Sequence, residues 1–230
     1  MPSTTRLQAC GVAIGPVFLG VWLVQALTRE GFDPARHPLS LLSLGDRGWI
    51  QVANFIAAGL LYLGFAAGVR RALHPGPGST WAPVLLGLSG VGMIMAGIFP
   101  TDPGAGFPPG APAGMPDYTV SGVLHEAGFL LASLSWTAAC LVLARSFAAA
   151  GRRGWPAACL AVPAGVFALI GWPDPSSLTV RLLIASAVQF AFVAALAVRI
   201  TRGLPRDLRA PRRPLSPVRP GRPGRSAPRR

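Results

Sequence analysis

The sequence predicts an all-α membrane protein, a polytopic bundle of about six transmembrane helices. Hydrophobic residues make up 51% of the 230 residues and charged residues only 13%, which is too apolar for a soluble domain of this size. Several apolar windows approach the roughly 20 residues that are needed to cross about 30 Å of hydrocarbon. Short stretches rich in Pro, Gly and charge separate these windows, as expected of connections at a membrane surface.

We expect six spans, which together form one transmembrane domain over residues 1–202. Their approximate bounds are 9–27, 50–69, 81–100, 122–144, 155–172 and 178–200. The first span follows Arg6 as a secretion signal would, but its run is long and no clear cleavage pattern follows, so we interpret it as a helix. The fifth span is the shortest and contains Pro156 and Pro163, which membrane helices tolerate where neighbours satisfy the freed backbone groups.

Residues 203–230 predict a disordered basic tail. Eleven of the 21 basic residues, all of them arginine, lie from Arg199 onward, and prolines are interspersed among them. We expect the tail to contact anionic lipid headgroups, an attraction on the order of 1 kcal/mol per arginine near the surface. Specific binding of nucleic acid is not expected, because the positive charge lies in this tail and not on a soluble folded surface.

The distribution of charge predicts a location in the inner membrane with both termini in the cytoplasm. This orientation puts 17 arginines inside and four outside, namely Arg29, Arg36, Arg47 and Arg181. The acidic residues give an independent check, because all except Asp207 fall in outer loops or at outer helix ends.

Each predicted outer loop carries an Asp-Pro pair. The pairs are Asp33-Pro34, Asp102-Pro103 and Asp174-Pro175. Their recurrence fits three helical hairpins descended from one unit. It also fits ordinary turn chemistry, in which Asp accepts hydrogen bonds from nearby backbone amides and Pro stops the preceding helix.

A candidate site lies where the third span ends and the fourth begins. Ionisable groups at membrane depth are expensive and therefore mark functional positions. Antiparallel helices bring Asp102 and His125 to the same depth, so Asp102 can hold the imidazole in one tautomer. With Ser40 from the first outer loop as nucleophile, His125 as base and Asp102 as orienting partner, these residues are the ingredients of an acyl-transfer site.

The same face offers residues for a ligand or a divalent ion instead. Asp46, Glu126 and Asp174 can supply oxygen ligands, and Arg181 lies among them. Sequence HEAGF at 125–129 lacks the second His of a zinc-binding HExxH helix, and no GxSxG motif is present. The metal and any cofactor therefore stay unidentified, and a purely structural hydrogen-bond network is a third interpretation of these residues.

Three runs of the chain resemble a known family. They are HPLSLLSLGDRGWIQVANFIAAGLLYLGFAAGVRR at 37–71, GIFPTDPG at 97–104 and HEAGFLLASLSW at 125–136. Together they are similar to the bacterial and archaeal membrane family numbered 998 among the domains of unknown function, over roughly residues 8–200. The resemblance implies a multi-helix membrane protein and supplies no activity.

The function that we expect is a non-catalytic scaffold or sensor in the lipid bilayer, with a polar cluster at the outer face. One alternative is an outer-leaflet lipid-modifying hydrolase that uses Asp102 and His125. Another is a small-solute transporter, although no charged residue falls in the middle of a predicted span. The sequence does not identify a protein partner.

Overall fold

The computed structural model describes residues 3–114 and 117–203 and is all-α over those residues, as the sequence predicts. The tail predicted over 203–230 lies outside the described residues except for Gly203. The helices are α1 (Thr4–Thr28), η1 (Leu39–Ser43), α2 (Gly48–Leu73), α3 (Trp81–Ile98), α4 (Val120–Ala149), α5 (Gly154–Ile170), η2 (Pro175–Ser177) and α6 (Leu178–Thr201), where η marks a short 3-10 helix.

All six expected spans correspond to helices. Five of them are long and apolar enough to cross a membrane, and α5 is a shorter apolar helix of 17 residues. Local capping sets several of the ends: Ser3 accepts a hydrogen bond from the amide of Arg6 at the start of α1. The first helix therefore begins at Thr4, earlier than the expected 9, because the cap and not the apolar run decides where it starts.

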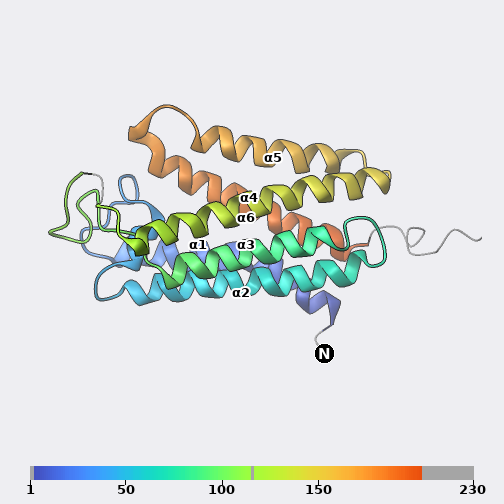
Figure 1. Ribbon diagram of the computed structural model, residues 1–230, viewed down its shortest axis with the longest axis horizontal. Helices are drawn as coiled ribbons and strands as arrows, with labels where there is room; N and C mark the ends of the chain where they lie inside the picture. The colour runs from blue at the N-terminus through green and yellow to red at the C-terminus, as the bar shows by residue number, and fades with distance from the viewer. Residues whose placement is uncertain (1–2, 115–116, 204–230) are drawn as a thin grey trace, which may run out of the picture.

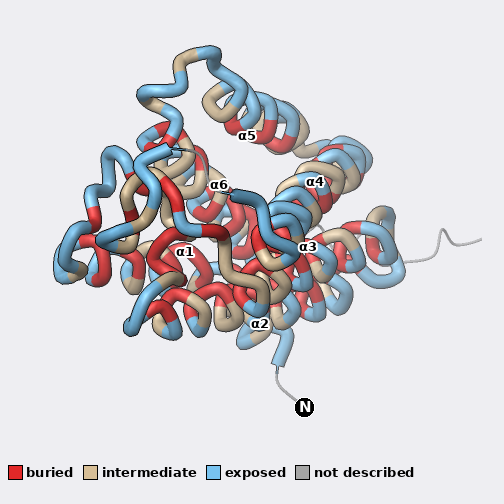
Figure 2. The backbone as a smooth tube through the Cα atoms, turned by 60° about the vertical axis from the view of Figure 1, so that its left-hand side comes forward, coloured by how far each residue is buried: buried red, intermediate tan, exposed pale blue. Residues whose placement is uncertain are grey.

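Each of the helices α1 to α6 packs on its neighbours in the chain, and α6 also packs on α1 and, less extensively, on α2. Figure 1 shows the helices lying alongside one another. Three connections, 29–47, 99–119 and 171–177, gather at one end of the bundle, which we call the long-loop end because it carries the two longest loops. The connections 74–80 and 150–153 lie at the opposite, short-loop end. Figure 2 shows that α5 is the most exposed helix, and its buried residues are Cys159, Pro163 and Val166.

Glycines bring the backbones of α2, α3 and α4 into contact. A Cβ added to Gly59 of α2 would lie 2.6 Å from the carbonyl oxygen of Gly90 of α3. One added to Gly92 would lie 2.5 Å from the carbonyl oxygen of Gly128 in α4. Small residues allow such close approach between membrane helices, where packing replaces the hydrophobic drive to associate.

Exposed aromatic side chains mark both ends of the bundle. Trp49, Tyr118 and Trp172 lie at the long-loop end, and Trp81 begins α3 at the short-loop end. Because tryptophan and tyrosine concentrate at the two membrane interfaces, their placement fits a bundle that spans the bilayer along its helices.

Loops 29–47 and 99–119 pack together into a folded cap. The fully buried ring of Phe107 meets the ring of Phe32 edge-on, with 5.3 Å between centroids. His37 is buried against both rings. Its Nδ1 accepts from the amide of Asp33 at 2.8 Å, so its Nε2 donates to the carbonyl oxygen of Ala105 at 3.1 Å. The long second loop thus covers this end by packing on the first loop.

Candidate functional site

Asp102 lies just after α3 and fastens the start of α4. One oxygen of its buried carboxylate accepts from the Thr119 amide at 2.9 Å, and the other accepts from the Thr119 hydroxyl at 2.5 Å. Thr119 is itself the N-cap of α4, where its hydroxyl accepts from the amide of Gly122. A Cβ on Gly122 would lie 1.9 Å from the carboxylate, so only glycine fits there. Asp102 therefore closes the loop and places negative charge at a helix N-terminus, where it is stabilising.

His125, one turn into α4, ties that helix to the end of α3. Its Nδ1 lies 2.9 Å from the carbonyl oxygen of Ala96 and 3.0 Å from that of Phe99. Carbonyl oxygens only accept hydrogen bonds, so Nδ1 carries the hydrogen and Nε2 is the basic nitrogen of the neutral ring. The ring of Phe55 meets the imidazole edge-on at 5.7 Å between centroids.

Asp102 is expected from the sequence to orient the imidazole of His125, but backbone carbonyl groups of Ala96 and Phe99 do so instead. The sequence puts Asp102 and His125 at the same end of neighbouring helices, and the structure does place them there. Within the described residues, however, no hydrogen bond joins the two side chains: Asp102 bonds to Thr119, and the carbonyl groups of α3 fix the imidazole tautomer.

The other residues predicted around His125 lie in different surroundings. Ser40 is half-buried in η1, where its carbonyl oxygen accepts from the Ser43 hydroxyl at 2.7 Å, and in the described chain no hydrogen bond connects it to His125. Glu126 is exposed on α4, and Asp46 is exposed at the end of the first loop. The nucleophile, base and carboxylate of the predicted acyl-transfer site thus share one end of the bundle without being bonded to one another.

Arg181 of α6 holds the end of α5. Its guanidinium donates to the carbonyl oxygens of Leu169 at 2.7 Å, Trp172 at 2.8 Å and Asp174, and its Nε donates to the Ser177 hydroxyl at 2.9 Å. The last carbonyl groups of a helix have no partner within the helix, so this buried side chain completes the C-terminus of α5.

Two of the three Asp-Pro pairs form the local turn that the sequence predicts. Asp33 accepts from the amide of Ala35 at 2.8 Å, and Asp174 accepts from the amide of Ser176 at 3.1 Å, each two residues further along the chain. The hydroxyls of Ser177 and Ser176, followed by that amide, lower the pKa of the Asp174 carboxyl. Asp102 departs from this pattern because its partner lies on the far side of the loop.

Sequence reasoning did not select His37, although it joins the two loops of the cap. The one feature of the sequence that could have drawn attention to His37 is its position as the first residue of the run 37–71, which carries the family resemblance. The local pattern alone gives no reason to pair it with the second loop, because its partner Ala105 lies 68 residues away.

The predicted ligand or ion residues Asp46, Glu126, Asp174 and Arg181 do not form one constellation. Asp174 and Arg181 share the corner between α5 and α6, whereas Asp46 lies near Arg29 at the start of α2. Among the residues that the structure describes, no three His, Cys, Asp or Glu side chains are placed to hold one metal ion.

Comparison with known proteins agrees with the resemblance in the sequence. The family described as "Protein of unknown function (DUF998)" matches residues 12–199, a stretch that covers most of the chain and reaches all six α-helices. No curated protein and no solved structure matches the chain. Taken with its apolar, bilayer-length helices, the match shows that the chain is an integral membrane protein that belongs to the DUF998 family.

Proposed function

We propose that this protein is a non-catalytic membrane scaffold or sensor that holds a rigid cap at the outer face of the inner membrane. The observation that carries the proposal is the way in which its buried ionisable side chains are hydrogen-bonded. Asp102, His125 and Arg181 are buried, and each bonds to backbone groups that end or begin a helix. Side chains that are hydrogen-bonded to helix ends in this way hold the loops and helices of the cap in fixed positions.

The bonding of His125 also argues against a role as general base. A base must lie about 2.6–3.2 Å from the proton that it removes, directly or through one water. In the described chain the imidazole hydrogen-bonds to two carbonyl oxygens and meets the ring of Phe55, and none of these partners carries a proton that a base would remove. A hydrolase at this end would need a nucleophile brought to Nε2 by movement of the cap.

The proposed orientation follows from the charges at the two ends. Arg70, Arg71, Arg152 and Arg153 lie at or beside the short connections, and the acidic residues of the described chain are confined to the long-loop end. Arginine in short loops is retained in the cytoplasm. The cap therefore faces outward in this proposal.

The test compares membrane lipid composition in cells that lack the protein, overproduce it, or carry His125→Gln. The scaffold or sensor proposal predicts an unchanged lipid profile in every case, with normal abundance of the variant in the membrane. The control is Glu126→Gln, an exposed neighbour on the same helix. A lipid that accumulates on deletion, and whose turnover needs His125 and not Glu126, would establish the hydrolase alternative in its place.

One observation favours the transporter alternative. In the described chain, buried side-chain atoms of Gln8, Gln25, Gln51 and Asn54 have no hydrogen-bond partner. Internal water or a polar solute is the usual partner of such atoms. Flux measurements on protein in liposomes test the transporter hypothesis. Transport that Gln51→Leu abolishes would support it, and no transport of any solute in a broad panel would count against it.

A further inference from the structure

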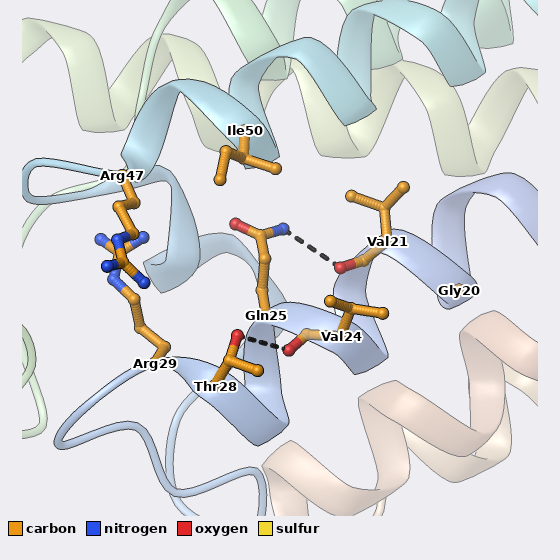
Figure 3. Close-up of a pocket in the computed structure, with 8 residues that line it drawn as sticks. All are labelled: Gly20, Val21, Val24, Gln25, Thr28, Arg29, Arg47 and Ile50. Carbon is orange, nitrogen blue, oxygen red and sulfur yellow. Dashed lines mark hydrogen bonds between the residues drawn. The ribbon is translucent and has the colours of Figure 1, made fainter.

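A groove lies between the end of α1 and the start of α2. It encloses about 350 Å³, within the size range of small-molecule sites. Figure 3 shows that its lining changes along its length, with two arginines at one end and aliphatic side chains beyond them. The lining residues are Gly20, Val21, Val24, Gln25, Thr28, Arg29, Arg47 and Ile50.

Arg29 and Arg47 lie together at one end of the groove (Figure 3). Arg29 is held in place by the carbonyl oxygen of Leu44 and by the ring of Phe107, 5.8 Å from its guanidinium carbon. Its Nη1 is buried and has no hydrogen-bond partner among the described residues. Burial and the nearby charge of Arg47 both lower the pKa of Arg29, and the carboxylate of Asp46 opposes them by a smaller amount. An anion between the guanidinium groups would relieve that repulsion.

The rest of the groove matches the apolar part of a lipid. It follows α1 from Arg29 down to Gly20, a distance of about 13 Å at 1.5 Å per residue. That distance is close to one leaflet, since the hydrocarbon core is about 30 Å thick. Val24 is 62% exposed, so the aliphatic wall is open on the outer surface of the bundle, where acyl chains lie in a membrane.

We propose that this groove binds an anionic phospholipid, with its phosphate between Arg29 and Arg47 and an acyl chain along Val21, Val24 and Ile50. The groove lies outside the predicted site, and the inference does not rest on the proposed function. Two guanidinium groups exceed the single negative charge of a phosphodiester, so a headgroup without a compensating cation is preferred over a zwitterionic one.

The test titrates the detergent-purified full chain with short-chain phosphatidylglycerol and counts bound lipids by native mass spectrometry. One saturable site is expected, and Arg47→Gln should weaken it about tenfold, which corresponds to about 1.4 kcal/mol. Arg47 is the decisive position because its guanidinium is exposed and bonds to no described residue, so its loss leaves the fold intact. Arg29→Gln should weaken binding similarly, with some loss of stability through Leu44 and Phe107.

The matched control is Arg36→Gln, which removes the same charge from an exposed position in the same loop. Equal affinities for the Arg47→Gln and Arg36→Gln variants would overturn the proposal. Phosphatidylcholine of the same chain length that binds equally well would overturn the preference for an anion. Inorganic phosphate that displaces the lipid at similar concentrations would show a free-phosphate site in place of a lipid site. Affinity that rises with acyl-chain length would support the aliphatic wall.

Discussion

Replacing Asp102 tests whether the hydrogen bonds of its carboxylate, or its charge, hold the start of α4 in place. Its two oxygens accept from the amide and the hydroxyl of Thr119, at 2.9 and 2.5 Å. In Asp102→Asn the remaining oxygen can keep the amide bond. The new NH₂ group can donate to the Thr119 hydroxyl oxygen, which has two lone pairs. Asparagine thus keeps both bonds and loses only the charge, whereas Asp102→Ala loses everything.

The expected magnitudes follow from those bonds. A hydrogen bond to a charged group contributes about 1.5–3 kcal/mol. Loss of two such bonds, partly offset by water reaching the loop, should lower the free energy of unfolding by about 3 kcal/mol for Asp102→Ala, against about 1 kcal/mol for Asp102→Asn. For a chain of this length these changes correspond to Tm decreases of roughly 6–12 °C and roughly 2–4 °C.

Thermal unfolding in detergent, followed with a thiol-reactive fluorophore, measures this difference. Cys140 and Cys159 are buried and become reactive as the bundle opens. The control is Asp46→Ala, which removes an exposed carboxylate from the same end and should leave Tm nearly unchanged. An Asn variant as unstable as the Ala variant would refute the reasoning, because it would mean that charge and not hydrogen-bond geometry fastens α4.

Three further predictions concern packing, the α5 terminus and pH. Gly92→Ala should lower stability by about 1–3 kcal/mol through overlap with the α4 backbone. Gly87→Ala in the same helix, where the new Cβ would make only an ordinary 3.9 Å contact with Leu63, should be neutral or stabilising in the same thermal assay. Arg181→Lys should loosen α5, since one ammonium cannot replace the guanidinium donors, and Cys159 should then react faster with maleimide below Tm. Because the folded pKa of Asp174 is lowered, its contribution to stability should be full above the ordinary carboxyl pKa, decline as the pH falls below that value, and be lost once the pH has passed the lowered folded pKa. Asp174→Asn should remove that acid-sensitive step from a stability–pH profile.

The helices could be predicted from sequence because the membrane imposes a strong rule. Every backbone polar group at membrane depth needs an internal partner, so apolar runs of bilayer length become helices whatever their other neighbours. The local turns at Asp33 and Asp174 were predictable for a similar reason, since their partners lie two residues away.

The partners of Asp102 and His125 could not be predicted in the same way. Hydropathy sets the depth of a residue in the membrane but not the path of a loop. Thr119 reaches Asp102 only because the chain between them folds back over 17 residues. For the same reason, the sequence could not predict that Arg29 and Arg47 lie close together. Both appeared in the sequence only as outer-loop exceptions to the positive-inside rule, and the fold of 29–47 brings them to one groove.

Cysteine labelling can determine whether the short helix α5 crosses the membrane. Its 17 residues are about 25 Å long, roughly 5 Å less than the hydrocarbon core, and such a mismatch costs only fractions of a kcal/mol per Å. Arg181 satisfies the carbonyl groups at its end, so α5 can stop short of water. In a Cys10→Ser background, we expect an impermeant maleimide to reach Gly171→Cys in intact cells and Gly154→Cys only after permeabilisation. Labelling of both from one side would mean that α5 does not cross, and the ends of α6 would then exchange sides.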